Sequence, residues 1–178
     1  MVSEAKKVLK WQIASVIWVI VVGSVLHFTY EWSGNSPIVG AFSAVNESVW
    51  EHLKLGYWSM IFFCLIEYPF IKDYANNYFF AKAVGIFAMN LFIVLFFYSY
   101  TAMLGKHSLI LDVIAYILGA VTYGVVSYRI MIKSFNRNLN VVGFILLVMF
   151  GSLFILFTYY PPHLPIFKDP QTGRYGTN

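Results

Sequence analysis

Residues capable of acid–base or metal chemistry are rare in this apolar chain, and several of them lie close together in the sequence. Residues 46–55 carry Glu47, Glu51 and His52. In a helix, side chains four positions apart lie on one face, so we expect Glu47 and Glu51 to point the same way. The same spacing separates His27 from Glu31, and we expect these two side chains to share a face as well.

Imidazole nitrogens and carboxylate oxygens are the ligands that zinc and similar divalent ions accept. The predicted metal ligands are His27, Glu31, His52 and His163; the predicted catalytic carboxylates are Glu47 and Glu51; and the predicted substrate contacts are Asn46, Trp50 and Asp169. Two histidines and a carboxylate, with another carboxylate left over, suit a metal-bound water and a general base. This combination predicts a hydrolase that acts on a lipid headgroup or a peptide at the outer leaflet.

The composition determines where such a site must lie. Of the 178 residues, 60% are hydrophobic, 20% are aromatic and only 11% are charged. A water-soluble domain needs more polar surface than this. The chain is therefore expected to be an integral membrane protein whose main partner is the lipid bilayer.

The apolar runs predict an all-α membrane protein in one domain, residues 1–178, with five spans. The expected spans are residues 11–30, 46–70, 79–103, 109–132 and 141–160. Small residues repeat at helical spacing in the third and fourth spans and predict close helix packing. Residues 32–45 are expected to be an interfacial or re-entrant segment, because a Ser-Gly-Asn-Ser-Pro cluster interrupts them. Residues 161–178 form a proline-rich outer tail.

Basic residues predict the orientation. With five spans, eight of the 12 lysines and arginines fall on one side, which places the amino terminus in the cytoplasm and the carboxyl terminus outside. All four histidines then lie on the outer side. Because the topology explains the basic loops, nothing indicates nucleic-acid binding.

Two other functions fit the same residues. The cluster is also compatible with a small-solute transporter or a substrate-binding subunit, since ionisable groups at membrane depth often mark a pathway. A structural or interaction protein without a ligand is the third alternative, with Glu47 and Glu51 stabilising a helix start and pairing with Lys54.

Three segments carry a resemblance to known sequences. They are residues 30–34 (Tyr-Glu-Trp-Ser-Gly), residues 45–55, and residues 161–170 (Pro-Pro-His-Leu-Pro-Ile-Phe-Lys-Asp-Pro). The chain resembles an uncharacterised family of small multi-pass bacterial membrane proteins over its whole length. The resemblance implies a helical bundle in a bacterial plasma membrane, and it implies no activity or catalytic residue.

Overall fold

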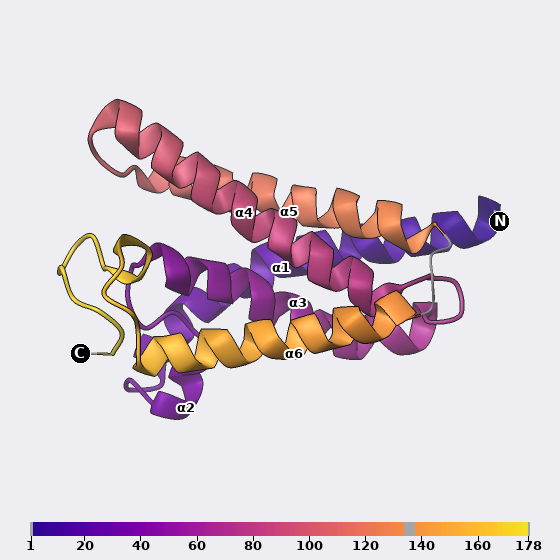
Figure 1. The fold of residues 1–178 in the computed structure, drawn as a ribbon, viewed down its shortest axis with the longest axis horizontal. Coiled ribbons are helices and arrows are strands. Elements are labelled where there is room, and N and C mark those ends of the chain that lie inside the picture. Colours follow the sequence, from indigo (N-terminus) through magenta and orange to yellow (C-terminus); the bar gives the residue numbers. More distant parts are fainter. Residues whose placement is uncertain (1, 134–137, 178) are drawn as a thin grey trace.

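The computed structural model describes residues 2–133 and 138–177, and within these ranges it contains helices and no strand. The elements are α1 (Val2–Trp32), α2 (Pro37–Gly40), α3 (Val49–Ile71), α4 (Tyr78–Leu104), α5 (Leu109–Met131), α6 (Asn138–Tyr159) and the 3-10 turn η1 (Pro165–Phe167). The five long helices run along the long axis of the molecule. As Figure 1 shows, α1 begins at one end, and the tail that follows α6 lies at the other. The expected all-helical class is confirmed.

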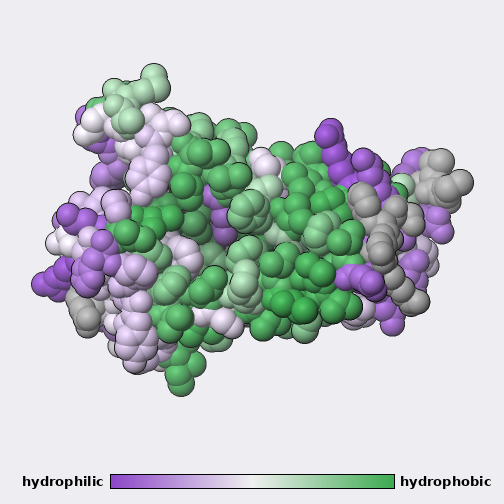
Figure 2. All heavy atoms as spheres, in the orientation of Figure 1, coloured by the Kyte–Doolittle hydropathy of each residue, from purple (hydrophilic) through white to green (hydrophobic). Residues whose placement is uncertain are grey.

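The outer surface of the bundle suits lipid. Four helices are long and apolar enough to cross a membrane: Ser3–Trp32 within α1, and all of α4, α5 and α6. Figure 2 shows an apolar band around the middle of the molecule, with polar residues gathered at both ends. A lipid bilayer is the environment in which such a band is stable.

Helix α3 is not among these four, so this criterion does not confirm the expected count of five spans. The reason lies in its charged residues. Glu51, Lys54 and Glu67 lower the apolar character of α3, yet all three are buried within the protein. The residues expected to be interfacial or re-entrant, 32–45, contain the end of α1 and one short helix, α2, joined by turns.

The helices approach closely where the small residues lie. A Cβ at Gly119 of α5 would stand 3.0 Å from Ile93 of α4, and a Cβ at Gly85 of α4 would stand 2.0 Å from the Ser127 hydroxyl of α5. Gly143 of α6 packs against the backbone of α4, where a Cβ would lie 2.2 Å from Phe80 Cα. The small-residue faces of the third and fourth spans therefore serve helix packing, as predicted.

A buried ion pair joins four elements in the half of the bundle near the start of α1. Lys82 Nζ lies 2.8 Å from Glu67 Oε2, 2.7 Å from the Tyr123 hydroxyl and 3.3 Å from Gln12 Oε1. All four side chains are buried. In a low-dielectric interior, each charge is tolerated only because the other is beside it.

We expect Lys82→Met to lower the free energy of unfolding by about 3–5 kcal/mol, because it leaves the Glu67 carboxylate buried without a cation. The double variant Lys82→Met/Glu67→Met removes both charges and should recover most of that loss. Reaction of Cys64, a buried free cysteine, with a thiol-specific dye during heating measures unfolding. The exposed Lys72→Met is the matched control. A double variant as unstable as the single one would contradict this account.

Candidate metal centre

Three ligand atoms from three separate elements meet at the end of the bundle where the tail lies. His27 Nε2 lies 3.2 Å from His52 Nε2, and Glu47 Oε2 lies 3.5 Å from His27 Nε2 and 3.6 Å from His52 Nε2. The three side chains are between 25 and 38% exposed, so the group is reachable from outside the protein. His27, Glu47 and His52 can together hold a metal ion.

The dimensions of this triangle match a zinc ion. A tetrahedral position above the plane of three atoms with these separations lies about 2.1 Å from each of them, within the range of Zn–N and Zn–O bonds. In a tetrahedral zinc site, ligand atoms are about 3.3–3.4 Å apart, which agrees with the observed spacings. Among the described residues, no fourth histidine, cysteine or carboxylate joins the group. One position of a tetrahedron would remain for water or a ligand.

Each ligand is positioned by a different local structure. His27 lies in the last turns of α1, and His52 lies in the first turn of α3. The His52 Nδ1 atom is 2.8 Å from the Ser48 carbonyl oxygen. Donation of the Nδ1 proton to that carbonyl leaves the Nε2 lone pair directed at the metal position, an arrangement typical of metal-binding histidines. Glu47 comes from the loop that precedes α3.

The neighbouring imidazoles keep Glu47 ionised. A hydrogen-bonding contact with His27 holds the pKa of the Glu47 carboxyl below its usual value, and attraction to His52 and His107 acts in the same direction. Partial burial opposes this effect without overcoming it. The carboxylate is therefore in the form that binds a cation.

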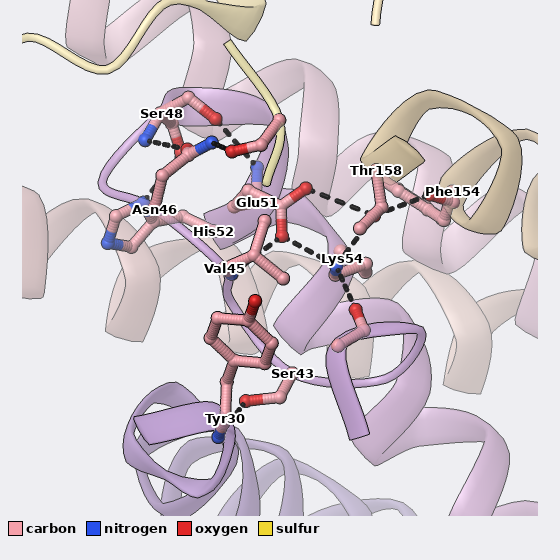
Figure 3. A network of polar contacts seen from close by, with 12 residues as sticks. Tyr30, Ser43, Val45, Asn46, Ser48, Glu51, His52, Lys54, Phe154 and Thr158 are labelled. Carbon is pink, nitrogen blue, oxygen red and sulfur yellow. Dashed lines mark hydrogen bonds and ion pairs between the residues drawn. The ribbon is translucent and has the colours of Figure 1, made fainter. Parts of the chain in front are cut away.

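Glu51 has a different environment from Glu47. Figure 3 shows the Glu51 carboxylate facing Lys54, with Oε2 2.5 Å from Nζ. The Val45 amide donates to the same oxygen at 3.0 Å, and the Thr158 hydroxyl of α6 lies 3.1 Å from the other oxygen. Lys54 also donates to the Gly40 carbonyl at 2.7 Å. Glu51, expected as a catalytic carboxylate, is thus occupied in a buried ion pair, and the geometry gives it a structural role.

The same network fixes the loop that carries Glu47. The Ser43 hydroxyl accepts from the Tyr30 amide at 2.9 Å and donates to the Leu26 carbonyl, which ties the loop to the end of α1 (Figure 3). The Val45 amide ties the loop to Glu51. The loop is thus attached to α1 through Ser43 and to α3 through Val45. These attachments restrict the position of Glu47, so its carboxylate is held opposite His27.

A cavity of about 290 Å³ adjoins the three ligands, and His27, Glu47 and His52 form part of its wall. At this end of the molecule, α4 and α5 tilt away from α3 and α6 (Figure 1). Apolar side chains line most of the interior, whereas the histidines and carboxylates lie together on its wall. A ligand in this cavity would meet the open position of the metal site.

The other predicted metal ligands lie apart from the three that meet. Glu31 is exposed at the end of α1, and His163 is exposed in the tail with its ring 4.7 Å from that of Tyr175. Glu31 is one turn beyond His27 on α1. Neither residue belongs to the group that can hold a metal ion.

The predicted substrate contacts hold the tail in place. Asn46 donates to the Gly176 carbonyl at 2.8 Å, and the Trp50 ring lies 4.8 Å from that of Phe167. Asp169 is buried and accepts from the Gln171 amide at 2.7 Å, which forms a tight turn. Each of the three residues contacts another part of the chain, and their role as substrate contacts stays a prediction. Helix α3 is capped by Ser48, and Asn46 accepts from the Ser48 amide.

Sequence reasoning missed two residues of the cavity wall, His107 and Asp112, which belong to the turn between α4 and α5 and to the start of α5. His107 Nδ1 lies 3.9 Å from Asp112 Oδ2, and the Tyr100 hydroxyl donates to the same carboxylate. The predicted topology could have indicated them, because the turn between the third and fourth spans lies at the same end of the bundle as His27 and His52.

The lowered pKa of Glu47 predicts how stability depends on pH. In protein freed of metal with a chelator, the ionised carboxylate stabilises the fold above its ordinary pKa of 4.5, and this contribution disappears as the pH falls through the lower value of the folded state. The thermal midpoint of the wild type should therefore exceed that of Glu47→Gln above about pH 5, and the gap should shrink as the pH falls below 4.5. The exposed Glu31→Gln serves as control and should follow the wild type. Parallel curves for wild type and Glu47→Gln would contradict the assignment.

Comparison with known proteins assigns a family and no activity. No curated protein and no solved structure matches the chain. Residues 1–177 match a family described as a family of unknown function, DUF6512. The match covers almost the whole sequence, and the chain belongs to this family.

Proposed function

We propose that this protein is a membrane-embedded, metal-dependent hydrolase that binds a zinc-type ion through His27, Glu47 and His52 at the outer face of the bundle. The observation that carries the proposal is the near-equilateral triangle of ligand atoms, whose sides of 3.2, 3.5 and 3.6 Å fit one tetrahedral ion. Two imidazoles and one carboxylate form a set that zinc accepts in catalytic sites.

A hydrolase also needs an open metal position and a base. A zinc ion with three protein ligands retains a position for water, and it lowers the pKa of that water to about 7. Asp112 lines the same cavity, where it accepts from the Tyr100 hydroxyl, and its carboxylate is the group that we propose as the general base. With an ion bound, the site would supply an activated water for the hydrolysis of an ester or amide bond at a carbonyl or phosphorus centre. Lipid headgroups and peptides contain such bonds.

We further propose that the chain crosses the membrane five times. Helix α3 has 23 residues, so it is about 34 Å long, sufficient for a hydrocarbon core of about 30 Å. Its charged side chains are buried against neighbouring helices instead of facing lipid. With five crossings, the lysines that begin α1 lie in the cytoplasm and the tail lies outside. The resemblance stated above supports a bacterial plasma membrane.

A small-solute transporter is the second candidate, because the buried Lys82–Glu67 pair is of a kind that often marks a pathway. Transport requires an aqueous route past Asn90. The cavity reaches Ile93, one turn from Asn90, and Asn90 is not part of its wall. The hydrolase proposal needs no such route, so the geometry supports it better.

We expect protein purified without chelator to contain one zinc-type ion per chain, measured by elemental analysis. His27→Ala or His52→Ala should weaken binding by more than about 10-fold, since even indirect partners of metal ligands contribute that much. Glu31→Ala and His163→Ala are matched controls and should leave binding unchanged. Affinity should fall as the pH is lowered, because protons compete with the metal for the ligand atoms. A metal content well below one ion per chain that does not change in His27→Ala would contradict the proposal. The protein would then be one that binds no metal ion at this site.

Thiol labelling of intact cells can count the crossings. In a Cys64→Ala background, Thr177→Cys should react with a membrane-impermeant maleimide and Ser3→Cys should not, because an odd number of spans places the two ends on opposite sides. Labelling after lysis is the control for reactivity, and both cysteines should then react. Equal protection or equal labelling of the two positions in intact cells would contradict five crossings.

A further inference from the structure

We infer that the cavity beside the metal site binds a membrane amphiphile, with its anionic head on the metal ion and a single apolar chain between α1, α3, α4 and α5. The inference rests on the proposed function, because the ion supplies the charge that receives the head. It identifies the class of substrate that the site would take.

The interior of the cavity is suited to hydrocarbon. Its wall includes Ile20 of α1, Leu55 of α3, Ile93 and Phe97 of α4, and Ala115 of α5. The volume of about 290 Å³ lies just below the range of small-ligand sites, about 300–1,000 Å³. We therefore assign a single apolar chain to this space.

The cavity is open along α5. Leu109, Val113 and Ile117 line it and are 75, 50 and 39% exposed. These residues follow one another at four-residue spacing, so they form one stripe along the helix. Because α5 is apolar enough to cross a membrane, its exposed stripe faces lipid. A molecule that already resides in the bilayer therefore reaches the cavity without passing through water.

The charged groups of the cavity wall indicate which head group the amphiphile has. Without an ion, the Glu47 and Asp112 carboxylates favour a cation. A bound divalent ion reverses the local charge at Glu47, so an oxygen of a carboxylate or phosphate becomes the preferred partner. A second hollow shares Phe97, His107 and Pro170 with the cavity and includes Lys106. The remainder of an anionic head extends from the ion toward these basic groups.

The tail closes the outer side of the cavity. Pro170 and Gln171 belong to its wall. Asp169 holds them in place through its bonds to Gln171 and Thr172, and Asn46 anchors the tail at Gly176. The opening along α5 is thus the side at which neither the tail nor a neighbouring helix covers the lining residues.

Binding of a dansyl-labelled undecanoic acid tests the inference in phosphatidylcholine nanodiscs that contain the zinc-loaded full chain. Val113→Phe places a ring on the open side of the cavity and should weaken binding by about 10-fold or more, given that a buried ring displaces several methylene groups. Val121→Phe makes the same change at an exposed position of α5 outside the cavity wall, and it should have no effect. Zinc binding, measured in parallel, should be unchanged in both variants.

Competitors identify the head. Dodecyl phosphate should displace the probe from zinc-loaded protein, and dodecyltrimethylammonium should not; removal of zinc should abolish probe binding. If zinc binds but Val113→Phe and Val121→Phe bind the probe alike, the amphiphile inference is overturned and the metal site stands. If zinc does not bind, the proposed function fails first, whatever the probe does. Preference for the cationic amphiphile would overturn the anionic head.

Discussion

The buried ion pair between Glu51 and Lys54 is the interaction on which this end of the molecule depends. Within one turn of α3, it joins the Gly40 carbonyl, the Val45 amide and the Thr158 hydroxyl of α6. Neither charged side chain is more than 2% exposed, so neither can exchange its partner for water. An isolated charge at such a position is costly, and the loop before α3 and the end of α6 are therefore fixed relative to each other.

The candidate metal centre follows from this constraint. Glu47 belongs to the loop that the ion pair holds, whereas His52 belongs to the helix that supplies it. A metal site requires ligand atoms placed to within a few tenths of an ångström, which a free loop does not provide. Without the fixed carboxylate of Glu47, only His27 and His52 would remain to bind a metal ion. Residues 46–55 thus supply both the buried ion pair and two of the three candidate metal ligands, and their two glutamates have different roles.

The sequence predicted the helices better than the contacts between side chains. The apolar runs predicted five long helical segments, and the small residues predicted the faces at which the helices pack. Both features depend on local composition. The same reasoning placed Glu47 and Glu51 on one helix face, and this was wrong because α3 begins at Val49, after the Ser48 cap. Glu47 therefore lies outside the helix and turns to His27, while Glu51 turns inward to Lys54. The roles of His107 and of the tail depend on tilts between distant helices, which spacing does not encode.

The ion pairs and the candidate metal centre are two groups of ionisable side chains that differ in burial. Glu51 with Lys54 and Glu67 with Lys82 form ion pairs in which both side chains are buried. The three ligand atoms of the metal centre differ, because they are partly exposed and adjoin a cavity. His27, Glu47 and His52 contact one another at the cavity wall, where a ligand has access to all three side chains.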